Sequence, residues 1–274
     1  MRVAVGQMQV SRDPQQNLAR IDELAARSAE SGARLLLLPE GLISRDAQVP
    51  GATRAGAQPP DGPFVSGLAD VSRRHRLALA GTVHLTASDS VVNAFLVLDE
   101  GRLLARYDKL HLYDAFRDKE SDKVTAGADY PPVVEIDGVR FGLITCYDLR
   151  FPDHARFLAL AGAEVLLVSA AWVRGPLKEH HWSTLCTARA LDTTSYVVAC
   201  GEVSARNIGL SCVVDPMGRA VSAAAEGEEL LVADLDLRRV SDVRAALPAL
   251  ANARFAPPVL QSFPPSLSHK ELSA

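Results

Sequence analysis

The sequence predicts an α/β fold in which a mixed β-sheet is covered by helices. Three observations support this prediction. Apolar segments of strand length alternate with amphipathic segments of helix length from the first residues onward. Some apolar runs are continuous, which is typical of parallel strands buried on both faces. Others are joined by short turns, which indicates antiparallel hairpins, so the sheet is expected to be mixed.

The first half of the chain contains five predicted strands and two predicted helices. An opening strand at residues 2–10 is followed by an amphipathic helix within 13–32 that Gly32 ends. Residues 33–41 read ARLLLLPEG, a continuous apolar run of the kind found in strands buried on both faces. The polar stretch at 112–132 is expected to be irregular. The other elements predicted here are a helix at 64–75 and strands at 77–85, 93–98 and 103–107.

The second half repeats the alternation and ends in hairpin signals. An apolar strand, Val139–Thr145, leads to a helix that Pro152 begins, since proline is tolerated in a first helical turn. The late segments LSCVVDPMGRAV and LLVADLDL are predicted to form a hairpin around a turn at 216–218. The remaining predictions are strands at 164–170 and 195–200 and helices at 152–162, 177–193 and 240–250.

Length and composition indicate one domain with a sizeable core. The chain has 274 residues, of which 48% are hydrophobic. We expect this domain to cover residues 1–255 and a Pro/Ser-rich tail to cover 256–274. The tail is expected to be either disordered or packed against a partner subunit.

Charge and cysteine content argue against several classes of protein. The 29 basic and 33 acidic residues give a net charge of −4 with no basic block, so nucleic-acid binding has little electrostatic support. No apolar run approaches the roughly 20 residues of a membrane span, and the N-terminus is too short in its apolar part for a secretory signal. Four cysteines without CxxC spacing argue against a zinc site or a disulfide scaffold, so a reducing cytoplasm is expected.

Three reactive side chains come at or just after the ends of predicted strands: Glu40, Lys109 and Cys146. Each has an ordinary alternative, respectively a solvated carboxylate, an exposed charge and a buried small apolar residue. Together they supply a thiol nucleophile, a base for its proton and a cation for developing negative charge. Ligands of open α/β sheets bind where strands end, so the combination predicts an active site.

The motifs around these residues resemble the nitrilase superfamily of carbon–nitrogen hydrolases over roughly residues 1–240. LLLLPEG is similar to the family's glutamate motif, YDKLHLYD to its lysine motif and GLITCYDLRFP to its cysteine motif. ESDKVTAGAD is similar to the segment with a second glutamate, which falls on Glu120. EHHWSTLCTARALDTTSYVVACGE and LSCVVDPMGR resemble a later helix and strand and a late hairpin.

The resemblance implies an α-β-β-α sandwich of mixed sheets flanked by helices, with subunits that pair into a homo-oligomer, a dimer or larger. It also implies a Glu40–Lys109–Cys146 triad that hydrolyses a small non-peptide amide through a thioester and releases ammonia. Glu120 would orient the lysine or the base, and the backbone N–H of Tyr147 would help to bind the oxyanion. No metal or organic cofactor is implied.

The sequence CYDLRFP resembles the amidase branch that includes omega-amidase and deaminated glutathione amidase, whose substrates carry a distant carboxylate. Arg150 and Arg174 are therefore candidates to bind a carboxylate, and Trp172 is a candidate for an apolar pocket wall. The alternative for Arg150 is a structural ion pair with Asp148 or Asp153.

Other mechanisms and classes remain open from the sequence. The same triad serves nitrile hydrolysis, carbamoyl-amino-acid hydrolysis and acyl transfer, and a catalytically idle scaffold homologue is an alternative of a different class. A Cys–His dyad would use His111, His154 or His181 as its base, although structural roles for these histidines are favoured. The other cysteines are expected in the core, and the Arg189–Asp192 pair is expected to be structural.

Overall fold

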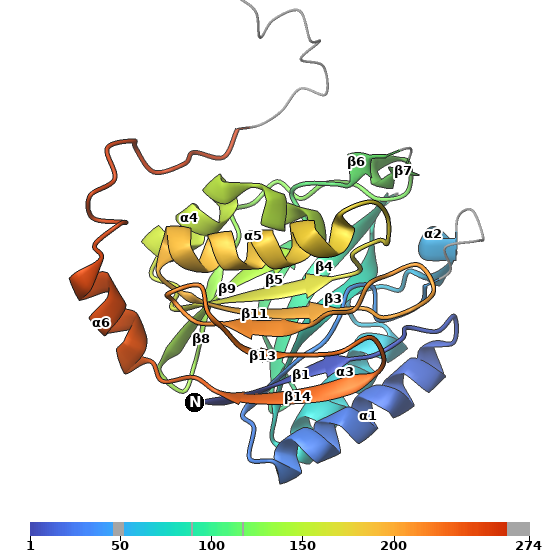
Figure 1. The fold of residues 1–274 in the computed structure, drawn as a ribbon. Coiled ribbons are helices and arrows are strands. Elements are labelled where there is room, and N and C mark those ends of the chain that lie inside the picture. Colours follow the sequence, from blue (N-terminus) through green and yellow to red (C-terminus); the bar gives the residue numbers. More distant parts are fainter. Residues whose placement is uncertain (46–51, 89, 117, 262–274) are drawn as a thin grey trace, which may run out of the picture.

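The computed structural model describes residues 1–45, 52–88, 90–116 and 118–261. Two six-stranded mixed sheets face each other, and helices cover the outer face of each sheet (Figure 1). The predicted α-β-β-α sandwich is therefore confirmed.

The first sheet has the order β14-β1-β2-β3-β4-β5. Its centre is parallel, because β1 pairs with β2 and β2 with β3 in the same direction. The edges are antiparallel: β14 adds to β1, and β3, β4 and β5 form a meander. The strands are β1 (Arg2–Gln7), β2 (Leu35–Leu37), β3 (Ala78–Ala87), β4 (Ser90–Asp99), β5 (Arg102–Asp108) and β14 (Glu229–Asp234).

The second sheet has the order β13-β12-β11-β10-β9-β8 and the same plan. The strands β9, β10 and β11 are parallel, and β8, β12 and β13 are antiparallel to their neighbours. Parallel strands carry their carboxyl ends to one edge of a sheet, and Cys146 lies at this edge, directly after β9. The strands are β8 (Val133–Ile136), β9 (Val139–Thr145), β10 (Val165–Ala170), β11 (Tyr196–Gly201), β12 (Cys212–Val214) and β13 (Ala220–Ala223).

The helices complete the layers and enclose three apolar clusters. One cluster lies between the sheets, around side chains such as Val5 and Phe141. A second lies between the first sheet and helices α1 and α3, and a third between the second sheet and helices α4 and α5 (Figure 1). The helices are α1 (Pro14–Glu30), α2 (Ala52–Gly56), α3 (Pro63–His75), α4 (Pro152–Leu160), α5 (Lys178–Thr193) and α6 (Arg238–Ala246).

The late hairpin differs in part from the prediction. The turn at 216–218 does join two antiparallel strands, β12 and β13. The segment LLVADLDL, however, crosses to the other sheet, where β14 pairs with β1. The physical reason is that β1 would otherwise be an edge strand with an unpaired row of backbone groups. Turn signals in a sequence predict pairing only between strands that are adjacent in the chain, so they do not predict the pairing of β14 with β1.

Further elements were not expected: the strand β8, the short strands β6 and β7, and a 3₁₀ turn. The strand β8 pairs with β9 through a turn at Asp137 and Gly138, which both have positive φ values. A DG pair between apolar runs is a hairpin signal that the sequence did contain. The stretch expected to be irregular holds the two-residue strands β6 (Asp114–Ala115) and β7 (Asp118–Lys119) and a 3₁₀ turn, Glu120–Asp122. No helix in the described part of the chain is long and apolar enough to cross a membrane.

Candidate active site

Glu40, Lys109 and Cys146 come together where three strand ends meet between the sheets. Glu40 follows β2, Lys109 follows β5 directly and Cys146 follows β9 directly. The backbone N–H of Glu40 donates to the carbonyl oxygen of Ala170 at the end of β10, 3.3 Å away. The end of β2 in one sheet therefore meets the end of β10 in the other, and the predicted site lies at this junction.

The Glu40 carboxylate is buried and accepts hydrogen bonds from three donors. Lys109 Nζ lies 3.1 Å from Oε1 and Asn93 Nδ2 lies 2.8 Å from the same oxygen. The backbone N–H of Ala171 donates to Oε2 at 2.9 Å. Burial alone would raise the pKa of Glu40, but the charges of Lys109 and Arg45 outweigh it, so the pKa lies below its usual range. The carboxylate is thus ionised and fixed in orientation.

Lys109 is held between two carboxylates. Besides Glu40, its Nζ contacts Glu120 Oε2 at 2.8 Å, and 1% of its side chain is exposed. Burial lowers the pKa of Lys109, but Glu120 and Glu40 raise it by more, so the ammonium stays charged. The backbone N–H of Gly127 donates to the Lys109 carbonyl at 2.8 Å, and a Cβ on Gly127 would meet the Asp108 carbonyl oxygen at 2.1 Å. Only glycine fits there.

Cys146 begins the 3₁₀ turn Cys146–Arg150 and has a φ of +45°, in the left-handed region. A residue other than glycine is strained in this backbone conformation, and such strain concentrates at functional sites. The thiol is largely buried, with 8% of the residue exposed. Burial and the Glu40 carboxylate raise the pKa of Cys146, and the opposing effects of Lys109 and the Ala171 N–H do not offset them. The resting site therefore holds a neutral thiol, although the Ala171 N–H acts in the direction of a thiolate.

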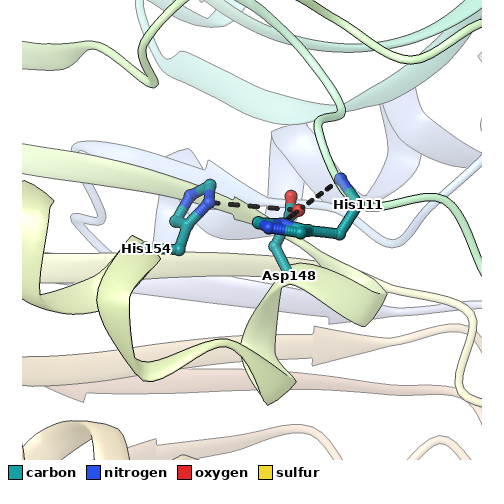
Figure 2. A group of neighbouring side chains, drawn as sticks. All are labelled: His111, Asp148 and His154. Atoms are coloured by element: carbon teal, nitrogen blue, oxygen red, sulfur yellow. Dashed lines mark hydrogen bonds and ion pairs between the residues drawn. The ribbon is translucent and has the colours of Figure 1, made fainter. Parts of the chain in front are cut away.

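Asp148 ties the nucleophile turn to the segment that carries Lys109. Its side chain is fully buried and accepts hydrogen bonds from Tyr107 Oη (2.9 Å), the Thr145 N–H (3.1 Å) and the His111 N–H (3.0 Å). His111 Nδ1 also lies 2.7 Å from Asp148 Oδ1. Figure 2 shows the His111 ring beside this carboxylate. Burial raises the pKa of Asp148, but His154, His111 and Lys109 together lower it below its usual range. The carboxylate is therefore a charged anchor.

His111, Asp148 and His154 also form the three-residue group in Figure 2 that could hold a metal ion, with ligand atoms within 4.8 Å of one another. The hydrogen bonding argues against this use. Both Asp148 oxygens already accept from donors, and His154 Nε2 lies 3.0 Å from the Leu143 carbonyl, which can only accept. His154 Nδ1 lies 3.9 Å from Asp148 Oδ1. We therefore read the group as a structural network and not as a metal centre, and its two histidines contact Asp148.

The three candidates for substrate binding have different surroundings; they are Arg150, Trp172 and Arg174. The Arg150 guanidinium lies over the Trp172 ring at 4.7 Å from its centroid, and one of its nitrogens is 3.4 Å from His181 Nδ1. Among the described residues it makes no ion pair with Asp148 or Asp153, so that alternative is wrong. Trp172 is buried and donates from Nε1 to the Lys178 carbonyl at 3.0 Å. Arg174 Nε instead donates to the Ser204 carbonyl at 3.3 Å, and the side chain lies 4.0 Å from Glu226.

Residues 2–245 match the carbon–nitrogen hydrolase family. The chain belongs to this family. It is 46% identical to the deaminated glutathione amidase of Escherichia coli O157:H7, over 95% of this chain and 100% of that protein. The carbon–nitrogen bond that the family hydrolyses is not a peptide bond, so this chain is a hydrolase of that class.

Two solved structures share the fold. One is a CN-hydrolase superfamily protein from Xanthomonas campestris with an arsenic adduct in its active site, 26% identical, with a TM-score of 0.84 over 93% of this chain and 98% of that one. The other is an amidase of the nitrilase superfamily from Nesterenkonia sp. AN1, in which acrylamide has added to the active-site cysteine. It is 29% identical, with a TM-score of 0.75 over 90% of this chain and 98% of that one.

Two residues near the site of this carbon–nitrogen hydrolase were not predicted. Asn93 donates to Glu40 and lies 3.3 Å from Glu120 Oε1. A lone Asn inside the apolar strand SVVNAFLVLD was the signal, because a buried amide needs partners. Lys178 at the start of α5 is also buried. Its sequence context, GPLKEHHW, gave no sign of this burial.

The remaining cysteines and the Arg189–Asp192 pair behave as structural residues. Cys186, Cys200 and Cys212 are buried in the core, as expected. The pair Arg189–Asp192 forms, and Arg189 Nε also donates to the Leu149 carbonyl at 3.0 Å, so it braces the nucleophile turn.

Proposed function

We propose that this hydrolase is an amidase that cleaves a small amide bearing a carboxylate, such as an omega-amide or a deaminated-glutathione-like compound. The proposal rests on the buried cluster of Glu40, Lys109 and Glu120 beside the strained Cys146 turn. Support for the substrate class comes from the relative named deaminated glutathione amidase. A primary amide would release ammonia, and a substituted amide would release an amine.

In the first half of the proposed reaction, the Cys146 sulfur attacks the carbonyl carbon of the substrate as Glu40 accepts the thiol proton. The carbonyl oxygen becomes an oxyanion, which the Lys109 ammonium and the Tyr147 backbone N–H stabilise. The C–N bond then breaks as Glu40 returns its proton to the leaving nitrogen. A thioester on Cys146 remains.

In the second half, a water molecule gives a proton to Glu40 and attacks the thioester carbonyl. Collapse of this second oxyanion breaks the C–S bond, and the sulfur regains a proton from Glu40 as the acid leaves. Glu120 and Asn93 act as positioning residues, because each contacts Glu40 or Lys109 directly and keeps the proton acceptor and the cation in fixed places.

For the substrate side we propose Arg150 as a carboxylate ligand, with Trp172 as the surface that orients its guanidinium. Arg174 is expected to contribute less, since a carbonyl and a glutamate already engage it.

The test is product formation from a panel of compounds, with Cys146→Ala protein as the blank. The panel holds 2-oxoglutaramate, deaminated glutathione, glutamine, an aliphatic nitrile and a carbamoyl amino acid. Ammonia is measured for the primary amides, and the released acid for the substituted ones. Turnover of the carboxylate-bearing amides would support the proposal. Turnover of the nitrile or carbamoyl compound alone would keep the triad and replace the substrate class. Silence with an unreactive Cys146 would favour the idle homologue.

We further propose that the hydrolase domain spans residues 1–255, and that the protein works in the cytoplasm as a homo-oligomer, a dimer or larger. Apolar side chains that are strongly exposed in the single chain support assembly, among them Phe255 (86%) and Val259 (76%). Both lie where the chain passes α4, and there Arg156 donates to the Phe255 and Ala256 carbonyls. Most of the proposed tail, 262–274, lies outside the described residues.

A further inference from the structure

Lys178 is a buried lysine whose described neighbours supply no carboxylate. It begins α5, and 5% of the residue is exposed. Its Nζ lies 2.9 Å from Tyr113 Oη, 4.1 Å from the centroid of the Phe116 ring and 5.2 Å from that of Tyr113. A hydroxyl and two ring faces stabilise an ammonium only in part, because cation–π contacts and neutral hydrogen bonds are weaker than an ion pair.

The position of Lys178 connects it to both halves of the active site. Tyr113, on which its ammonium rests, donates its backbone N–H to Glu120 Oε2 at 2.7 Å, and that oxygen also binds Lys109. The Tyr113 ring packs edge-on against Tyr147, the residue after the nucleophile, at 5.1 Å between centroids. Tyr113 therefore connects Lys178 both to the Lys109–Glu120 pair and to the turn that carries Cys146.

A second cation lies close by. Trp172 donates to the Lys178 carbonyl from one edge and carries the Arg150 guanidinium on its face. Burial lowers the pKa of Lys178, and the positive charge of Arg150 lowers it further. Two cations that repel each other beside a nucleophile, without an acidic partner among the described side chains, make a local electropositive site.

We propose that Lys178 is a specificity-determining residue which, together with Arg150, binds the substrate carboxylate at the end away from the scissile amide. This inference rests on the proposed amidase function and extends it, since it names the group on the enzyme that selects acidic amides over neutral ones. A bound carboxylate would replace the missing counter-ion of Lys178 and lie between the two cations. Neutral amides would leave the lysine unpaired, which disfavours their binding.

The first test compares an acidic amide with a matched neutral one, 2-oxoglutaramate and its methyl ester, in steady-state kinetics. For Lys178→Met we expect KM for the acid to rise roughly tenfold or more, as for loss of a charged hydrogen bond, and KM for the ester to change little. Lys178→Arg should restore part of the difference. Arg102→Gln, which removes an exposed positive charge at the far end of β5, is the control and should match the unaltered protein. Equal changes for acid and ester in Lys178→Met would overturn the proposal.

A second test does not depend on turnover. Iodoacetate and iodoacetamide alkylate the same thiol, but only iodoacetate carries a negative charge. The rates of alkylation at Cys146 are read by mass spectrometry of its peptide. The rate with iodoacetate divided by the rate with iodoacetamide should fall several-fold in Lys178→Met and stay constant in Arg102→Gln. A shifted ratio in a protein that hydrolyses no amide would support the cationic subsite and reject the amidase function. An unchanged ratio in an active amidase would reject the subsite and keep the function.

Discussion

At the scale of single residues, the charges around Cys146 determine whether its thiol is protonated. Glu40 and Glu120 contribute two negative charges, Lys109 contributes one positive charge, and both carboxylates contact the lysine. A thiolate at Cys146 would add another negative charge in a buried place, which is why its pKa is raised. Deprotonation during attack therefore requires an acceptor, and Glu40 is the proposed one.

Glu40→Gln is expected to reduce kcat for the amide substrate by roughly 100- to 10,000-fold, the usual range for loss of a general base. The amide side chain keeps the shape and some of the hydrogen bonds but cannot accept the thiol proton. Steady-state product formation measures the loss, and an unchanged circular dichroism spectrum controls for folding. A variant with full activity would refute the role of Glu40.

The same variant is expected to lower the pKa of the Cys146 thiol, although it lowers the rate of catalysis. Because the Glu40 carboxylate raises the pKa of Cys146, its replacement by a neutral amide should lower that pKa. The pH midpoint of iodoacetamide alkylation at Cys146 should then move to lower pH in Glu40→Gln. A midpoint that moves upward, or not at all, would contradict the resting-thiol interpretation.

At the scale of elements, the nucleophile turn and the segment after β5 act as one unit through Asp148. Four donors from Tyr107, His111 and Thr145 converge on its carboxylate, so the turn that presents Cys146 is fixed against the segment that presents Lys109. Asp148 therefore helps to fix the position of Cys146 relative to Lys109.

Asp148→Asn should lower kcat at least tenfold and change KM less, because it loosens the turn without touching substrate. Tyr107→Phe, which removes one of the four donors, is the graded comparison and should cost less. If Asp148→Asn altered only KM, its assignment as a positioning residue would be wrong.

The difference in stability between the unaltered protein and Asp148→Asn should also depend on pH in a defined direction. The folded-state pKa of Asp148 lies below its ordinary value, so its ionised form contributes stability above about pH 4 and loses it as pH falls through the folded-state pKa. The difference in Tm between the unaltered protein and Asp148→Asn should therefore be largest near neutral pH and shrink below about pH 4. Thermal melts between pH 3 and pH 7 would measure it.

At the scale of the whole molecule, three apolar clusters hold four layers together. The central cluster lies between the sheets, and Cys146 packs in the cluster between the second sheet and helices α4 and α5. Side chains from both sheets share this central cluster, so the strand ends that carry Glu40 and Cys146 are held at a fixed separation. Phe141, in the middle of β9, is fully buried there.

Phe141→Ala is expected to reduce the free energy of unfolding by about 3–5 kcal/mol, the range for removal of a buried aromatic ring. Chemical denaturation would measure it, with Leu103→Ala, at an exposed position on β5, as the control that should change little. A loss no larger than in the control would mean that the two sheets do not depend on this contact.

Assembly is tested by removing residues 256–274 and comparing molar masses by light scattering. The full-length chain is expected at twice the monomer mass or more. If the tail packs against a partner subunit, the truncated protein should shift toward monomer, and an unchanged mass would show that the tail does not hold the interface.

The local features of this protein could be predicted from the order of its amino acids. Alternation of apolar and amphipathic segments was enough to locate β9, α4, β10 and α5 to within two residues, because periodicity and caps are local. It also placed Glu40, Lys109 and Cys146 at or just beyond strand ends. The motifs around them, in that order, indicated the family.

Which of these residues meet, and what surrounds them, depends on the three-dimensional arrangement of the chain. The pairing of β14 with β1, the contacts of Tyr107 and His111 with Asp148, and the contact of Lys178 with Tyr113 join residues that lie 37 to 232 positions apart in the chain. The protonation state of Cys146 belongs to the same group, because it depends on burial and on Glu40, which lies 106 positions earlier in the chain. Such electrostatic effects follow distance in space, and the order of residues alone does not give that distance.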